Sequence, residues 1–463
     1  MSKPLSRRRF VQTSAVAVAG FPALVSCQNV NSKLQIAAVG VSNKGLSDVR
    51  EVGSHPKAKF VAFCDIDTTR FTGADAAFPG TPHYADFREM YEKLGDKFDA
   101  VTVSTPDHMH ALPALLAMRR RKHVYLQKPL THSVEEARLL TLEAERMGVQ
   151  TRMGNQIHSR TEYRTAVKLI QSGRIGKVKE VHSWHPNPGN RYTQLTGLPP
   201  ATAPVPAGLS WDLWLGVAPA RPYTPDVYHP FKWRDWLDFG CGTLGDFGCH
   251  IYDPVFCALE LTKPLTISAD SVGANSQTWC AAETIKYVYP GTRYTAGKTI
   301  TMTWHDGGRK PDEALARLPK GRKLFDGGSM FIGTEGVLLL PHVGTPVLLP
   351  EEKFGATLTP GEEARRKRAL AKGEKVPAIK IADIQAEDSL NHYHGWVDAA
   401  LTGVECSDNF AYAGPLTEAV LLGTIASRFT GATLKWDAEG MNITNHKAAN
   451  ALVRKEYRDG WRV

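Results

Sequence analysis

"LQIAAVGVSNKG", residues 34–45, joins a run of apolar residues to a turn that contains two glycines. The apolar run predicts a buried strand, and the residues after the turn can form a helix as far as Val52. A second apolar run follows over residues 58–67 and ends in acidic residues. A strand, a helix and a second strand in this order predict a βαβ unit.

The glycine turn and the end of the second strand match the pattern of a dinucleotide site. Gly40, Ser42 and Gly45 stand where the fingerprint has three glycines, and Asp65 closes the second strand. In such a turn the backbone amides and a helix N-terminus face a pyrophosphate, while the carboxylate binds ribose hydroxyls. A carboxylate repels the 2′-phosphate of NADP, and Ile66 adds no positive charge, so we predict NAD in preference to NADP. The alternative for Asp65 is a cap or turn residue after the strand.

Strands and helices continue to alternate as far as residue 151. Strands are predicted over residues 100–104 and 123–127, and helices over residues 109–121 and 133–148, the latter with Ser133 and Glu136 as a capping box. This pattern predicts a doubly wound parallel sheet, a Rossmann domain, over residues 33–151. Ligands bind at the carboxyl ends of such strands, where the sequence places Thr105, Asp107, His108, Gln127 and Lys128.

The remainder, residues 152–463, is predicted to be an α+β domain with an open, mainly antiparallel sheet. Five stretches, "GKVKEVHSWHP", "LTISADSVGA", "AAETIKYVYP", "KTITMTWHDG" and "GSMFIGTEGVLLLP", read as strands. The final helices can pack back on the first domain. Between the first two strands lies a loop rich in Trp, Tyr and Phe, in which Arg234 and Trp236 are our predicted substrate contacts. Those aromatic residues stack on sugar rings or, alternatively, pack the loop itself.

Four motifs give the chain a family resemblance. "STPDHMHA" (residues 104–111), "LQKPL" (126–130), "GNQ" (154–156) and "GTLGDFGCHIYD" (242–253) follow the glycine turn in this order. The chain thereby resembles the Gfo/Idh/MocA oxidoreductases, the glucose-fructose oxidoreductase and inositol dehydrogenase family. The resemblance implies that Lys128 touches both cofactor and substrate, that Asp246 and His250 complete the catalytic set, and that Gln156 contacts the substrate. Gln127 departs from the family's glutamate, so it can form hydrogen bonds but carries no charge.

The predicted catalytic residues suit the oxidation of an alcohol. Asp246 and His250 are four residues apart, which places them on one face of a helix. Removing a hydride from an alcohol carbon is easier as the hydroxyl proton leaves, so His250 can act as the base. The ammonium of Lys128 can stabilise the developing alkoxide, and Asp246 can bind a hydroxyl or orient the histidine. The alternative for His250 is a histidine that only packs within its helix.

The first 27 residues read as an export signal. "SRRRFVQTSAVAVAGFPALVSC", residues 6–27, has a charged start and an apolar run too short to cross a bilayer. Arg7, Arg8 and Phe10 resemble a twin-arginine signal, whose route carries folded proteins. "LVSC" resembles a lipobox, in which Cys27 is acylated; the alternative is an ordinary cleaved signal. We therefore predict an exported, periplasmic protein that Cys27 can anchor to the membrane, with the twin-arginine machinery as a partner.

Export bears on function because NAD is made in the cytoplasm. We predict a sugar oxidoreductase that folds around tightly bound NAD before it leaves. The alternatives are an NAD-dependent, redox-neutral glycoside hydrolase or lyase, and a lipid-anchored carbohydrate-binding protein. The net charge falls from +9 to +5 without the signal, which carries four basic and no acidic residues, so nucleic acid is not expected. We also expect a homo-oligomer and no metal, because His392 and His394 cannot face the same way on one helix.

Overall fold

The computed structural model describes residues 33–192 and 202–462. Six parallel strands form the first sheet, in the order β3-β2-β1-β4-β5-β6. This order is that of a dinucleotide-binding Rossmann sheet. The strands are β1 (Leu34–Val39), β2 (Ala58–Cys64), β3 (His83–Tyr84), β4 (Ala100–Val103), β5 (His123–Leu126) and β6 (Thr151–Met153).

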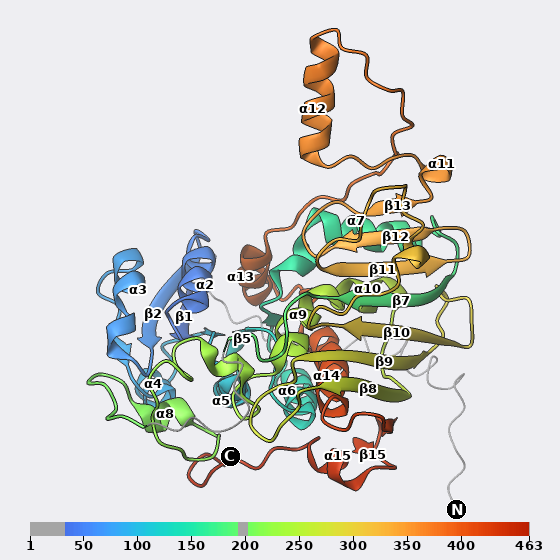
Figure 1. Ribbon diagram of the computed structural model, residues 1–463. Helices are drawn as coiled ribbons and strands as arrows, with labels where there is room; N and C mark the ends of the chain where they lie inside the picture. The colour runs from blue at the N-terminus through green and yellow to red at the C-terminus, as the bar shows by residue number, and fades with distance from the viewer. Residues whose placement is uncertain (1–32, 193–201, 463) are drawn as a thin grey trace, which may run out of the picture. The chain divides into compact units, whose positions relative to one another are not determined.

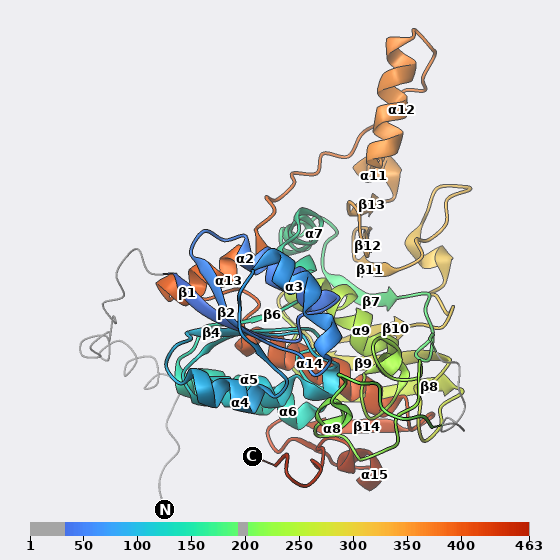
Figure 2. The ribbon, with the colours of Figure 1, turned by 90° about the vertical axis from the view of Figure 1, so that its left-hand side faces the viewer.

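Helices cover both faces of the first sheet (Figure 2). They are α2 (Lys44–Gly53), α3 (Thr72–Ala77), α4 (Phe87–Leu94), α5 (Ala111–Arg119) and α6 (Val134–Met147). Side chains of β1 alternate between two cores: Ile36 and Ala38 pack with Val49 of α2, while Ala37 and Val39 pack toward α4 and α5. Successive side chains of a strand point to opposite faces, so a strand buried on both faces is apolar throughout.

Nine strands form the second sheet, in the order β13-β12-β11-β7-β10-β9-β8-β14-β15. They are β7 (Val178–Trp184), β8 (Thr266–Val272), β9 (Ala282–Pro290), β10 (Thr299–His305), β11 (Gly328–Gly333), β12 (Val337–Pro341), β13 (Val347–Leu349), β14 (Thr433–Asp437) and β15 (Asn442–Ile443). Neighbouring strands run antiparallel except for β7 and β10, which confirms the predicted fold class.

Most of the remaining helices lie beside the second sheet or link the two sheets, whereas α12 (Pro360–Ala371) projects away from both (Figure 1). They are α7 (Thr161–Gln171), α8 (Trp211–Leu215), α9 (Gly242–Ile251), α10 (Asp253–Leu259), α11 (Glu351–Phe354), α12 (Pro360–Ala371), α13 (His392–Thr402), α14 (Phe410–Ala426) and α15 (Lys447–Ala451). Helix α13 packs on α2, and α14 packs on α6 and on β8. Both sheets belong to one compact unit that begins at Leu34, and the division at residue 151 stays a prediction.

Two predicted boundaries shift in the structure. The strand predicted to reach Asp67 ends at Cys64, since the carboxylate of Asp65 accepts the N–H groups of Val41 and Asp67. The helix predicted from Met109 begins at Ala111, after a 3-10 turn over Asp107–Met109. The capping box of Ser133 and Glu136 is confirmed. "GSMFIGTEGVLLLP" is a hairpin of β11 and β12.

Other predictions concern features away from the strands. Residues 1–27, with Arg7, Arg8 and Cys27, lie outside the described residues. In the part of the chain that is described, no helix is long and apolar enough to span a bilayer. The same residues contain no cluster of three or more His, Cys, Asp or Glu side chains placed to hold a metal. The six described cysteines are unpaired, and all except Cys257 are buried.

Candidate active site

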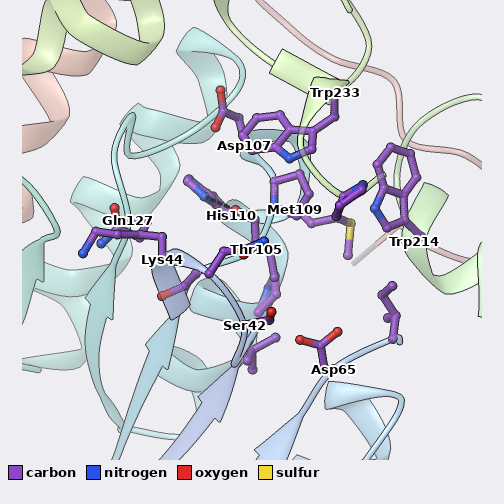
Figure 3. Close-up of a pocket in the computed structure, with 18 of the residues that line it drawn as sticks. Ser42, Lys44, Asp65, Thr105, Asp107, Met109, His110, Gln127, Trp214 and Trp233 are labelled. Atoms are coloured by element: carbon purple, nitrogen blue, oxygen red, sulfur yellow. Dashed lines mark hydrogen bonds between the residues drawn. The ribbon is translucent and has the colours of Figure 1, made fainter. Parts of the chain in front are cut away.

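A cavity of about 360 Å³ opens at the carboxyl ends of β1, β2, β4 and β5. Residues from the glycine turn, from these strand ends, from α9 and from residues 213–234 form its wall. Figure 3 shows Ser42 and Asp65 beside the strand ends, with Trp214 and Trp233 across the cavity from them. Ligands of doubly wound sheets bind at this edge, so this cavity is the candidate active site.

Neither glycine of the turn has room for a side chain. Gly40 has a φ of +81°, and a Cβ atom there would lie 2.5 Å from the carbonyl oxygen of Ser104. A Cβ atom on Gly45 would lie 2.1 Å from the carbonyl oxygen of Gly40. Helix α2 starts directly after this turn, and its N-cap, Asn43, makes no side-chain capping bond. The tight turn and the uncapped helix start fit a pyrophosphate group.

Asp65 lies at the end of β2 and lines the cavity as predicted. Its Oδ2 atom accepts the N–H of Val41 at 3.1 Å, which ties it to the glycine turn. Burial raises the pKa of Asp65 to about 6, although these backbone hydrogen bonds oppose the shift. Arg70 also lines this end of the cavity, with its Nε atom 3.2 Å from Oδ2 of Asp67. No sequence motif marks this cation, which lies five residues beyond Asp65 and bears on the choice between NAD and NADP.

Two further residues predicted to bind the cofactor line the cavity. The Oγ1 atom of Thr105 is buried and has no hydrogen-bond partner among the described residues. Gln127 lies in the wall, and its Nε2 atom donates to Oδ2 of Asp48 at 2.8 Å. Asp48 is also the ion-pair partner of Lys44. An unpartnered buried hydroxyl at the wall fits a polar ligand in the cavity.

His108, which we predicted to bind the cofactor, lies behind the wall of the cavity rather than in it. Its ring packs against Trp214 and Phe239, its Nε2 atom donates to the carbonyl oxygen of Trp214 at 3.0 Å, and it does not line the cavity. His110 lines the cavity instead, next to the carbonyl oxygens of Thr105 and Pro129. The 3-10 turn that precedes α5 directs the two histidines differently, and the sequence did not predict that turn.

Lys128, Asp246 and His250 converge on the cavity as predicted from the motifs. The Nζ atom of Lys128 lies 2.6 Å from Oδ1 of Asp246, although 118 residues separate them in the chain. Asp246 and His250 come from successive turns of α9. Burial, followed by the charge of Lys128, lowers the pKa of His250 well below its ordinary value. The imidazole is therefore neutral near pH 7, and the same two causes make it a weaker base than an exposed histidine.

Asp246 is held as a carboxylate by three cations. Besides Lys128, Arg191 donates to its Oδ2 atom at 2.7 Å, and the Nε atom of Arg234 lies 3.6 Å from the same oxygen. Burial opposes ionisation of Asp246, but Lys128, Arg234 and Arg191 together lower its pKa well below the ordinary value. Arg191 was missed by sequence analysis, because it lies in a loop without any motif.

Asp107 is a second carboxyl group in the wall, close to Lys128. Its Oδ2 atom accepts the N–H of Cys241 at 3.1 Å. Burial raises the pKa of Asp107 to about 7, with the charge of Asp246 adding to the rise and that of Lys128 opposing it. Close to Lys128 the site therefore holds an ionised carboxyl group, Asp246, and one that titrates near neutral pH, Asp107.

Of the predicted substrate contacts, Gln156 and Arg234 line the cavity, but Trp236 does not. Trp236 is fully buried, donates from Nε1 to the carbonyl oxygen of Val227 at 3.0 Å, and packs on Tyr228. Around Trp236 the aromatic loop packs on itself, as in the alternative given for these residues, and the ring does not reach the cavity. Trp214 and Trp233, from the same loop, line the cavity instead, as does Trp461 near the C-terminus.

Comparison with known families agrees with this geometry. A family model described as an oxidoreductase family with an NAD-binding Rossmann fold matches residues 34–155, and the model of that family's C-terminal alpha/beta domain matches residues 160–332. The chain belongs to the Gfo/Idh/MocA oxidoreductase family. This Gfo/Idh/MocA protein therefore has the nicotinamide-binding fold that its glycine turn predicted.

Individual relatives of this Gfo/Idh/MocA chain match only in part. An inositol 2-dehydrogenase of Arthrobacter sp. (strain FB24) is 27% identical over 157 residues, which are 34% of this chain and 46% of that protein. A glycosyl hydrolase family 109 protein of Saccharopolyspora erythraea is 27% identical over 206 residues, 38% of this chain and 45% of that protein. The chain thus matches less than half the length of these curated relatives.

A solved structure shares the fold over nearly the whole described chain. The crystal structure of aldose-aldose oxidoreductase from Caulobacter crescentus, in complex with glycerol, superposes with a TM-score of 0.55 at 15% sequence identity. The superposition covers 87% of this chain and 100% of that one. At this identity the likeness establishes the fold alone.

Proposed function

We propose that this protein transfers a hydride between a carbohydrate CH–OH group and a tightly held nicotinamide cofactor, with NAD preferred to NADP. One observation carries the proposal: Lys128, Asp246 and His250 meet in the cavity that also contains the glycine turn and Asp65. A base, a cation and a carboxylate at one end of a dinucleotide groove suit alcohol oxidation.

Residues of the chain itself transfer the proton and stabilise the charge that develops on the substrate. NAD, when bound, supplies the hydride acceptor. His250 lines the cavity as a neutral imidazole, so its unprotonated nitrogen is the group placed to take the hydroxyl proton of the substrate. The ammonium of Lys128 stabilises the negative charge that develops on that oxygen, and Asp246 fixes the ammonium in position at 2.6 Å. Gln156 and Arg234 lie in the same wall and can bind the neighbouring hydroxyl groups.

Tight cofactor binding is supported by the segment of residues 208–234, several of which line the cavity. The backbone of residues 208–210 pairs with the end of β2, where the N–H of Thr68 donates to Gly208 and the N–H of Ser210 donates to Ile66. His229, further along the segment, lies 3.0 Å from Oδ2 of Asp67. The segment thus holds Trp214 and Trp233 over the cavity. We infer that these contacts slow the departure of a bound ligand, because they hold tryptophan side chains in the cavity wall.

Export is a separate part of the proposal, and it rests on the sequence of residues 1–27 alone. A twin-arginine substrate folds before transport, so it can carry NAD out of the cytoplasm. A protein that then released NADH would lose its cofactor after one turnover. We therefore propose that the bound cofactor is reoxidised in place, by a second substrate or an external acceptor. We also propose that Cys27 is acylated and, separately, that the protein forms a homo-oligomer.

The test begins with the cofactor and then separates three activities. Protein is dialysed extensively, denatured, and the released dinucleotide is identified by its mass. Holoprotein is then incubated with free aldoses and inositols and, separately, with nitrophenyl glycosides, while absorbance at 340 nm is followed; Lys128→Ala is the control. Oxidised sugar with reduced cofactor supports the proposal. Release of nitrophenol without net cofactor change indicates a glycosidase, and binding without either reaction indicates a carbohydrate-binding protein.

A further inference from the structure

The amide of Asn155 determines which nitrogen of His250 carries the hydrogen. Its Nδ2 atom lies 2.6 Å from the carbonyl oxygen of Cys249 and 2.8 Å from Oδ2 of Asp253. Both neighbours are acceptors, so Nδ2 donates to them and Oδ1 is left to accept. The Nδ1 atom of His250 lies 2.5 Å from this Oδ1 atom. A carbonyl oxygen has no hydrogen to give, so His250 donates from Nδ1 and its Nε2 atom is unprotonated.

Asp253 holds the amide of Asn155 in this orientation. Its carboxylate is buried, and both of its oxygens are occupied. Oδ1 accepts from the hydroxyl groups of Tyr163 and Tyr412, and Oδ2 accepts from Asn155 and from Nδ1 of His158 at 2.8 Å. Burial lowers the pKa of His158, but the charge and hydrogen bond of Asp253 together with the charge of Asp408 outweigh burial, so the pKa lies above its ordinary value. Turning the carboxylate would break several of these bonds at once, so it is a fixed acceptor.

We propose that Asn155, held by Asp253, is a positioning residue that keeps His250 in the tautomer with hydrogen on Nδ1. The Nε2 atom is then the one that takes the substrate proton. His250 lines the cavity, and no hydrogen bond to its Nε2 atom is found among the described residues. The catalytic consequence rests on the proposed function, whereas the tautomer is a property of the resting protein. A buried polar partner of this kind fixes which ring nitrogen is the base.

The tautomer can be measured without any reaction. Holoprotein is labelled with ¹⁵N-histidine, and the signals of His250, one of 16 histidines, are assigned from their absence in His250→Gln. We expect a protonated Nδ1 and an unprotonated Nε2 in the wild type, and a mixture of tautomers in Asn155→Leu. Hydrogen on Nε2 in the wild type, or the same single tautomer in Asn155→Leu, would overturn the proposal.

Kinetics test the consequence for turnover. Asn155→Leu should lower kcat about 10- to 100-fold with little change in KM, because it keeps the base but not its orientation. Exchanging the two groups, Asn155→Asp together with Asp253→Asn, restores an acceptor for Nδ1 and should recover part of the loss. The matched control is Tyr252→Phe, which removes a buried hydrogen bond to Tyr289 elsewhere. An equal loss in the control would reduce Asn155 to a structural role.

The outcomes also separate this inference from the proposed function. If the wild type shows the expected tautomer but reduces no cofactor with any sugar, the proposed function fails and the positioning of His250 stands. If sugars are oxidised while Asn155→Leu retains the wild-type kcat, the function stands and the positioning role is refuted.

Discussion

Replacing Asp107 with asparagine should change how the stability of the protein depends on pH. Asp107 is almost completely buried in the cavity wall, and this burial raises its pKa from 3.8 to about 7. Asparagine has the same shape, and its Oδ1 atom can still accept the N–H of Cys241. The change therefore removes the ionisation and preserves the hydrogen bond.

The size and sign of the effect follow from linkage. An acid whose pKa is raised by folding favours the folded state fully below its unfolded pKa, and that contribution is lost as pH rises through the folded pKa. A rise from 3.8 to about 7 corresponds to about 4 kcal/mol, at about 1.4 kcal/mol per pKa unit. The free energy of unfolding of wild type, relative to Asp107→Asn, should thus fall by about this amount between pH 4 and pH 8, mostly below pH 7.

Urea unfolding of both proteins across this pH range measures the difference, provided that refolding is complete and the cofactor state is matched. The control is Asp96→Asn, because the Asp96 side chain is fully exposed. The free energy of unfolding of wild type relative to this variant should be nearly independent of pH. The free energy of unfolding of wild type relative to Asp107→Asn could instead stay constant or rise with pH. Either result would show that Asp107 is ionised in the folded protein at low pH. The reasoning about burial at this wall would then be refuted.

Three further outcomes are expected. Lys128→Ala and His250→Ala should each lower turnover about 100-fold or more in steady-state assays while leaving the circular dichroism spectrum unchanged, because charge-stabilising and proton-transfer groups contribute on this scale; a wild-type rate in either would exclude that residue. Asp65→Ala should weaken NAD retention during dialysis and narrow the preference against NADP, measured by Kd for both, and an unchanged preference would leave Asp65 as a turn residue only. Replacing Arg7 and Arg8 with lysine should retain active, cofactor-loaded protein in the cytoplasm, and cell fractionation that finds it still exported would remove the twin-arginine proposal.

Much of the fold could be predicted because its signals are local. The apolar run of β1 and the glycines at 40 and 45 specify a strand and a turn from neighbouring residues alone, and the structure confirms both. The four-residue spacing of Asp246 and His250 likewise places both on one side of α9, from which they reach the same cavity. Short-range backbone geometry determines each of these features, so no distant contact was needed to predict them.

The structure departs from the sequence predictions at residues whose surroundings come from distant segments of the chain. His108 and His110 could not be told apart from the motif, since Trp214, which packs against His108, is more than 100 residues away in the chain. Trp236 and Trp233 lie in one loop and both are buried, and which of them also lines the cavity depends on how that loop folds on Tyr228 and Phe239. Side-chain direction in a loop is set by packing, which local propensity does not encode.

The sequence by itself determined the class of chemistry, because a glycine turn, a strand-terminal carboxylate and a Lys, Asp and His set are recognisable by residue type and order. Only the tertiary structure decided the charge states and tautomers of the groups that carry out this chemistry. It brought Asn155 to within hydrogen-bond distance of His250 across 95 residues of chain, and it surrounded Asp246 with Lys128, Arg191 and Arg234. Charge states and tautomers depend on burial and on partners a few ångströms away, and chain folding, not chain order, sets those distances.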